Sequence, residues 1–231
     1  MNNRIPGVAT ILFDVGNTLT WVDLARAGSI LEEHGLSRPA TDVEEAEAAA
    51  RREMYLAPAG TSDADRWAGY VTSIFRELGV EAARLASLRE AMFEVHRTEH
   101  LWRRVLPGTD AILVELAERG YRLGVVSNSD GRVEPLLEDV GLARHFEVIV
   151  DSQVVGIEKP DPRIFALALE RMAADAESAI YVGDFPAVDV VGARRAGLRP
   201  VLLDPLDIGV GGDYPRLRAL SELSRLLPER A

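Results

Sequence analysis

The chain lacks cysteine altogether, and it has a single lysine, Lys159, among 26 lysine and arginine residues. The missing cysteines exclude disulfides, thiolate nucleophiles and cysteine-bound metal sites. Positive charge is also scarce, and the net charge is −11. Such a negative charge argues against a nucleic acid or an anionic membrane as the main partner. No apolar run approaches the ~20 residues of a membrane span, and MNNRIPG shows no signal pattern. We therefore expect a cytoplasmic protein.

What the sequence does contain is a series of short, continuous apolar runs that alternate with helical patterns. Such runs are typical of strands in a parallel sheet that is covered on both faces. The pattern predicts an α/β fold with a Rossmann-like, five-stranded parallel sheet flanked by helices. The predicted strands are Val8–Phe13, Arg122–Val126, Phe146–Val150, Ile180–Val182 and Pro200–Leu203. The predicted helices between and after them are Thr109–Arg119, Val133–Val140, Pro162–Ala173, Ala187–Ala196 and Arg216–Leu227.

The region between the first two strands is too long for a simple crossover, which needs only about 30 residues. It reads as an inserted all-α domain over residues 20–105, and residues 1–19 and 106–231 then form the α/β core. Its predicted helices are Asp23–His34, Asp42–Leu56, Asp63–Leu78 and Glu81–Leu101. An insert joined at two points beside a site is a natural lid, and such helices serve equally well as a homodimer surface.

Each predicted strand runs into a polar residue, and ligands of open parallel sheets bind beyond the carboxyl ends of the strands. The residues in question are Asp14, Ser127, Asp151, Asp184 and Asp204. A carboxylate leaving a buried strand suits a nucleophile or a metal ligand. Ser127 and the backbone donors after it could hold an anion, and a lone lysine in an arginine-rich chain suggests a specific role. Asp184 and Asp189, if a loop brings them together, suit Mg²⁺.

Four blocks, FDVGNTL, VVSNSD, IEKPDPRIF and VGDFPAVDVVGARRAG, together resemble the haloacid dehalogenase-like hydrolase superfamily, in the branch with a helical cap after the first strand. The resemblance implies a phosphatase acting on a small phosphorylated metabolite through an aspartyl-phosphate. It implies that Asp14 is the nucleophile and that Ser127, Asn128 and Lys159 bind the phosphate. The implied Mg²⁺ ligands are Asp14, the carbonyl of Gly16 and Asp184, with Asp189 supporting through water or Lys159.

Gly16 departs from the family pattern, which usually has an acid–base Asp two residues after the nucleophile. Losing such a group typically costs about 10²–10⁴-fold in rate. The substrate could then carry a good leaving group such as an acyl phosphate, another residue could substitute, or catalysis could be feeble. Asp23 is the candidate substitute, although an N-cap of the first inserted helix explains it equally well.

Three other interpretations bear on the same residues. Dehalogenases of the superfamily lack this Asp too, but their last motif also lacks the metal-binding acid that Asp184 retains here. Relatives that cleave phosphonates use a cap lysine, which the insert does not have. His96 and His100 fit the H-x-x-E-H zinc pattern, but no third ligand can be assigned. A non-catalytic member that binds a phosphorylated ligand or a protein is the last alternative.

Overall fold

The computed structural model describes residues 4–57, 61–208 and 212–228, which divide into two compact units. The sheet unit contains the described residues up to Trp21 and from Val105 onward, and the helical unit is Val22–Arg104. Among the described residues, no helix is both long and apolar enough to cross a membrane.

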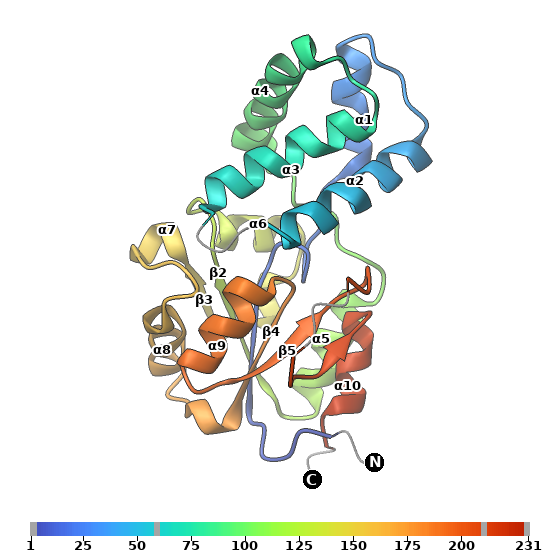
Figure 1. Ribbon diagram of the computed structural model, residues 1–231. Coiled ribbons are helices and arrows are strands. Elements are labelled where there is room, and N and C mark those ends of the chain that lie inside the picture. Colours follow the sequence, from blue (N-terminus) through green and yellow to red (C-terminus); the bar gives the residue numbers. More distant parts are fainter. Residues whose placement is uncertain (1–3, 58–60, 209–211, 229–231) are drawn as a thin grey trace. The chain divides into compact units, whose positions relative to one another are not determined.

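The sheet unit is built on a parallel sheet in the order β3-β2-β1-β4-β5-β6 (Figure 1). Its strands are β1 (Thr10–Phe13), β2 (Arg122–Ser127), β3 (Val148–Asp151), β4 (Ala179–Gly183), β5 (Arg199–Leu203) and β6 (Arg216–Leu217). The chain adds β2 and β3 on one side of β1 and then crosses to the other side for β4. This reversal is a topological switch point, where open α/β sheets bind ligands.

The sheet has six strands rather than the predicted five, and the predicted helix Arg216–Leu227 is wrong. Its first two residues form β6, which pairs with β5. A 3₁₀ turn, Leu220–Glu222, and the short helix α10 (Leu223–Leu226) follow. Arg216 is drawn to the sheet because its guanidinium pairs with the buried carboxylate of Asp204 at the end of β5. The glycine-rich stretch Gly209–Tyr214 lacks the Gly-Lys-Ser/Thr of a phosphate-binding loop, and the sequence therefore predicts a turn there. It lies partly outside the described residues.

The two faces of the sheet carry separate apolar layers, because side chains along a strand alternate between faces. Ile11 and Phe13 of β1 belong to the layer under α5 (Thr109–Glu118), α6 (Val133–Asp139) and α10. Leu12 belongs to the opposite layer, under α8 (Pro162–Arg171) and α9 (Val191–Arg195). Each large side chain so buried contributes roughly 1.5–3 kcal/mol. Both layers hold the central strands, and therefore the residues after them, in fixed positions.

The helices of the sheet unit start and stop largely where the sequence signals them. The Asp161 carboxylate accepts a hydrogen bond from the Arg163 N–H at the start of α8. Gly120, Gly141 and Gly197 lie just past the predicted helices and follow α5, α6 and α9 with positive φ, as is common for a C-terminal cap. The predicted helix Ala187–Ala196 differs, because it opens with a π-turn, Pro186–Val190, before α9. The four-residue helix α7 (Ser152–Val155) was not predicted.

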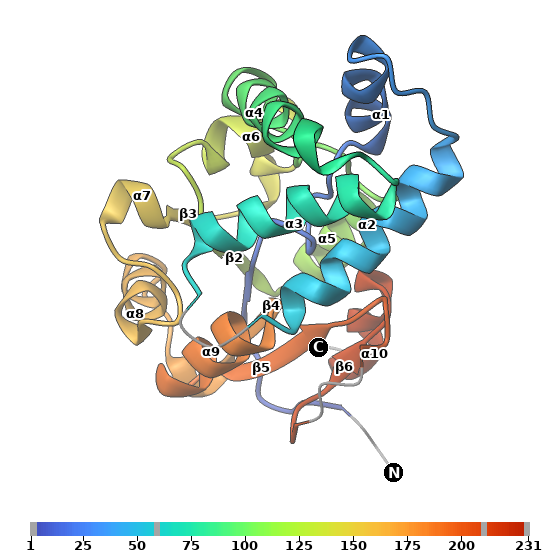
Figure 2. The ribbon, with the colours of Figure 1, turned by 45° about the horizontal axis from the view of Figure 1, so that its top comes forward.

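The helical unit consists of α1 (Leu24–Glu33), α2 (Ala40–Tyr55), α3 (Asp63–Glu77) and α4 (Ala82–Glu99). The helices α2 and α3 run side by side, as both ribbon views show (Figures 1 and 2). The apolar faces of all four helices meet in a separate core that includes Ile30 of α1, Phe75 of α3, and Leu88 and Met92 of α4. Within this core the Tyr70 hydroxyl donates to the buried Glu47 carboxylate.

Gly192, in α9, packs tightly against α8 and the residue Pro160 before it. A Cβ at this position would lie 2.6 Å from Cε2 of Phe165 and 3.1 Å from Cα of Pro160. We expect Gly192→Ala to lower the free energy of unfolding by about 1–3 kcal/mol, the usual effect of overpacking. The measurement is urea unfolding followed by far-UV circular dichroism.

Gly28 is the matched control for this experiment. It lies inside α1, and a Cβ there would have no neighbour within 4 Å. Gly28→Ala should therefore stabilise the protein by roughly 0.5–1 kcal/mol, through helix propensity alone. A Gly192→Ala protein as stable as the wild type would contradict the packing described above.

Candidate active site

A cluster of buried polar side chains lies at the carboxyl ends of β1, β2 and β4. Asp14 directly follows β1, Ser127 ends β2 and Asp184 directly follows β4. All three side chains are buried, at 3–7% exposure. Because β2 and β4 are the two neighbours of β1, the parallel sheet brings these three residues together although up to 170 positions separate them in sequence.

Lys159 places its ammonium group at the centre of this cluster. Its Nζ donates to Oδ1 of Asp14 at 2.6 Å, to Oδ1 of Asp189 at 2.8 Å and to the hydroxyl of Tyr181 at 2.8 Å. The lysine is only 5% exposed. An ammonium group has three donors, and all three are used here. The single lysine of the chain is therefore fully hydrogen-bonded at a buried position.

The backbone of Lys159 is held by the side chain of Asn128. The Lys159 N–H donates to Oδ1 of Asn128 at 2.7 Å, and Nδ2 of Asn128 donates to the Lys159 carbonyl at 3.0 Å. The peptide bond from Lys159 to Pro160 is cis. The resemblance assigns Asn128 to phosphate binding, but here both the oxygen and the nitrogen of its side-chain amide hydrogen-bond the backbone of Lys159. A phosphate contact from Asn128 would fall to its backbone N–H.

Asp14 accepts two hydrogen bonds on one oxygen, since Oδ1 also receives the Ser127 hydroxyl at 3.2 Å. Burial raises the pKa of Asp14, the charge of Lys159 lowers it, and the charge of Asp189 raises it again. Together these effects raise the pKa of Asp14 to about 6. The pKa is thus raised despite the adjacent ammonium. Any added positive charge nearby would favour the ionised carboxylate.

Lys159 and Tyr181 stay protonated at neutral pH. Burial would lower the pKa of Lys159, but the charges of Asp14 and Asp189 outweigh it and raise that pKa above its ordinary value. Burial, followed by the charges of Asp189, Asp14 and Asp184, raises the pKa of Tyr181 well above the ordinary tyrosine value. The Tyr181 hydroxyl therefore remains a donor, and it donates a hydrogen bond to the Val126 carbonyl at 2.7 Å.

Asp189 reaches the cluster from the π-turn that opens the region of α9. Its Oδ1 receives the Lys159 ammonium and its Oδ2 receives the Phe185 N–H at 2.9 Å. Carboxylate oxygens of Asp14, Asp184 and Asp189 lie within 4.8 Å of one another. Three carboxylates facing one ammonium leave a formal charge of −2. This all-oxygen, negatively charged donor set fits a hard divalent cation such as Mg²⁺.

The remaining predicted residues have other surroundings. Gly16 lies in the tight loop after β1, in a backbone bridge with Thr20. Asp151 accepts from the N–H groups of Gly131, Val133 and Gln153, and Asp204 pairs with Arg216. These two strand-end carboxylates therefore hold the backbone and the sheet edge together.

Two sequence-based alternatives concern the helical unit. Asp23 caps α1, since its carboxylate accepts the Arg26 N–H at 3.0 Å; its catalytic role stays a prediction. His96 accepts the Leu101 N–H on Nδ1 at 3.2 Å, and its ring packs against Trp67, His100 and Trp102. The surroundings of His96 within this unit are thus those of a packed aromatic cluster.

Tyr181 is the functional residue that sequence reasoning missed. It lies inside the apolar run of β4 and is fully buried, so periodicity identifies it as core. The available signal was its hydroxyl, because a buried tyrosine requires a hydrogen-bond partner. Here that partner is part of the polar cluster.

Comparison with known proteins identifies relatives of this chain. A family model described as haloacid dehalogenase-like hydrolase matches residues 8–197. The chain is 35% identical over 173 residues to haloacid dehalogenase-like hydrolase domain-containing protein 3 of Mus musculus, covering 73% of this chain and 68% of that protein. It is 41% identical over 145 residues to a phosphoserine phosphatase of Thermus thermophilus, covering 60% of this chain and 56% of that enzyme.

A solved structure shares the fold. The magnesium-bound crystal structure of the HAD-hydrolase YfnB from Bacillus subtilis aligns with a TM-score of 0.67 over 95% of this chain and 98% of that one, at 23% identity. Since the family model covers most of its length, the chain belongs to the haloacid dehalogenase-like hydrolases.

Proposed function

We propose that the protein is a Mg²⁺-dependent phosphatase that acts on a small phosphorylated metabolite through an aspartyl-phosphate. The observation that carries this proposal is the contact of one Asp14 oxygen with both the Lys159 ammonium and the Ser127 hydroxyl. A carboxylate beside a cation and a hydroxyl donor is suited to attack a phosphoryl group whose oxygens take over the same donors. The likeness to a protein named phosphoserine phosphatase supports the same class.

The reaction follows from these positions. An Asp14 oxygen attacks phosphorus, the bond from phosphorus to the leaving oxygen breaks, and its electron pair leaves with that oxygen. Lys159 and Ser127 hydrogen-bond the phosphoryl oxygens as charge shifts in the transition state. Water then attacks the aspartyl-phosphate, which releases inorganic phosphate and restores Asp14.

A divalent cation would be held by Asp14, Asp184 and the Gly16 carbonyl, with Asp189 in support through Lys159. When bound, the cation would offset the negative charge of the transferred phosphoryl group. The formal charge of −2 on the buried cluster supports its place there. The retained Asp184 also favours phosphoryl transfer over dehalogenation.

Gly16 determines which substrates react well under this proposal. The leaving oxygen needs a proton unless it is weakly basic, and Gly16 has no carboxyl group to give one. Acyl phosphates should therefore react faster than alkyl phosphates. The ratio of the two rates should approach the factor of about 10²–10⁴ that general acid catalysis contributes.

Asp14→Asn tests the central role of the nucleophile. Phosphate release from acetyl phosphate and from a panel of phosphorylated metabolites, with Mg²⁺ present, should fall at least about 10³-fold in this variant. Halide release from 2-chloropropionate, measured alongside, reports on the dehalogenase alternative. Phosphate release that persists in Asp14→Asn would refute the proposal, and halide release without phosphate release would favour the alternative.

Asp23→Asn separates the two interpretations of Asp23 in the same assay. Asparagine caps helices as well as aspartate does, so α1 should stay intact while any proton donor is lost. A lower rate with alkyl but not with acyl phosphates would identify Asp23 as the missing acid. Unchanged rates with both would leave it as an N-cap only.

Mg²⁺ should stabilise the folded protein through the carboxylate cluster. At 100 times the dissociation constant, binding raises the free energy of unfolding by about 2.7 kcal/mol. We expect this gain in the wild type and its loss in Asp184→Asn, measured by thermal unfolding with Mg²⁺ or EDTA.

Asp204→Asn is the matched control, because it makes the same change at the end of β5, where the carboxylate pairs with Arg216. Its baseline stability should fall while the gain from Mg²⁺ remains. An equal gain in Asp184→Asn would show that the cation binds elsewhere.

Tyr181→Phe should weaken catalysis by removing one of the three acceptors of the Lys159 ammonium. We expect kcat to fall about 5–30-fold with a smaller change in KM, since the aromatic ring stays and a misaligned lysine acts mainly in the transition state. Tyr121→Phe is the control, because its hydroxyl donates to the Pro228 carbonyl, outside the cluster. Equal kinetics for the two variants would remove Tyr181 from the site.

A further inference from the structure

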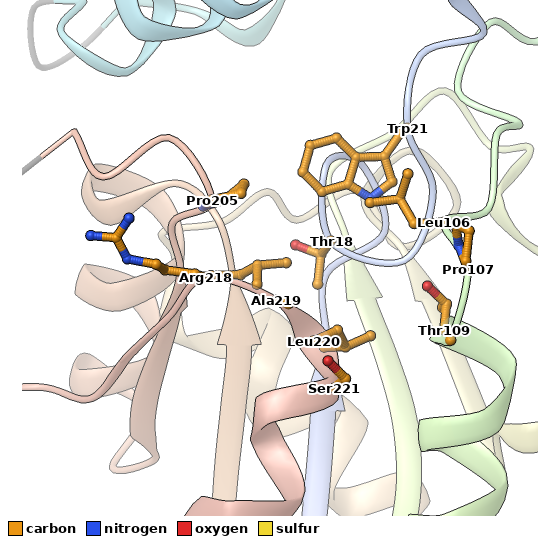
Figure 3. Close-up of a pocket in the computed structure, with 12 residues that line it drawn as sticks. Thr18, Trp21, Leu106, Pro107, Thr109, Pro205, Arg218, Ala219, Leu220 and Ser221 are labelled. Atoms are coloured by element: carbon orange, nitrogen blue, oxygen red, sulfur yellow. The ribbon is translucent and has the colours of Figure 1, made fainter.

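The sheet unit contains a pocket that the proposed reaction does not use (Figure 3). Its volume is about 90 Å³, several times the ~10–15 Å³ that one water molecule requires. It lies beside the loop after β1, and its walls come from four separate segments of the chain. The lining residues are Thr18, Trp21, Leu106, Pro107, Gly108, Thr109, Leu203, Pro205, Arg218, Ala219, Leu220 and Ser221.

Thr18 turns an unsatisfied hydroxyl toward this pocket. The residue is 1% exposed, and its Oγ1 has no hydrogen-bond partner in the part of the chain that the structure describes. Figure 3 shows the hydroxyl oxygen on the side of Pro205 and Ala219. The hydroxyl of Thr20, in the same loop, is bonded to the Val15 carbonyl. A buried hydroxyl without a hydrogen-bond partner is unfavourable by about 1–3 kcal/mol. A ligand in the pocket that hydrogen-bonds Thr18 would remove this unfavourable contribution.

The walls determine which ligands fit. The indole ring of Trp21, Leu106 and Leu220 make most of the lining apolar. Arg218 is the charged residue among the lining residues, and its side chain is 66% exposed and paired with Asp207. A charged ligand group beside Thr18 would lose its hydration without gaining an ionic partner, which is strongly unfavourable. The pocket thus suits an uncharged molecule.

We propose that this pocket binds a small, uncharged, largely apolar molecule with one hydroxyl or carbonyl oxygen, which hydrogen-bonds Thr18 and packs on Trp21. The site is distinct from the carboxylate cluster, yet it shares the loop that carries Asp14. In that loop the N–H groups of Thr18, Leu19 and Thr20 all point to the Val15 carbonyl.

Phenol is the probe, because it combines one hydroxyl with a flat ring. The chain has three tryptophans, of which Trp21 lines the pocket while Trp67 and Trp102 lie in the helical unit. In protein labelled with 5-fluorotryptophan, Trp21→Phe assigns the ¹⁹F signals. We expect phenol to shift the Trp21 signal saturably, with a millimolar dissociation constant, and to leave the other two unmoved.

Two variants test the contacts. Thr18→Val keeps the side-chain shape without the hydroxyl and should weaken binding about 5-fold. Ala219→Phe fills the pocket from an exposed position in extended backbone and should abolish binding. Val114→Phe, at an exposed position on α5 that does not line the pocket, should bind phenol normally.

The proposal is overturned by a Trp21 signal that does not saturate, by equal shifts of all three signals, or by unchanged binding in either Thr18→Val or Ala219→Phe. The experiment needs neither Mg²⁺ nor substrate. Its outcome is therefore independent of whether the protein is a phosphatase.

Discussion

The ammonium group of Lys159, buried among acceptors, is the interaction on which the site depends. A buried ammonium is tolerable only when its three donors are satisfied and its charge is balanced. Asp14, Asp189 and Tyr181 satisfy the donors, and the Asn128 amide fixes the backbone from which the side chain starts. Much of the local structure, including the π-turn that brings in Asp189, serves to place this one charge beside Asp14.

The sequence allowed the sheet and its polar rim to be predicted, because buried parallel strands are continuous apolar runs. It could not show which rim residues meet. Five polar residues follow strands, but only Asp14, Ser127 and Asp184 share the cluster, since β2 and β4 flank β1. Asp151 and Asp204 follow strands further out. That distinction depends on the spatial order of the strands, which sequence order alone does not give.

The missed features have a common cause, which is that their signals are short or local. A two-residue strand such as β6 has no periodicity, and its position depends on the pairing of Arg216 with Asp204. The π-turn before α9 is associated with the two hydrogen bonds that the Asp189 carboxylate accepts, from the Lys159 ammonium and from the Phe185 N–H. Tyr181 satisfies the pattern of a buried strand completely, so only its hydroxyl distinguishes it. In each case a tertiary contact determines the structure, not the propensity of the segment.

Two polar groups that are unfavourable for stability lie close together on the segment after β1. At the end of β1, Asp14 is a carboxylate in surroundings that raise its pKa to about 6. Four residues later, Thr18 buries a hydroxyl without a partner. Stability alone would favour neutral, satisfied groups at both positions, and natural proteins keep such departures mainly where function requires them. The proposed phosphoryl transfer would explain the carboxylate. The hydroxyl has no part in that chemistry, and a ligand in the adjacent pocket is the simplest physical reason for it to be there.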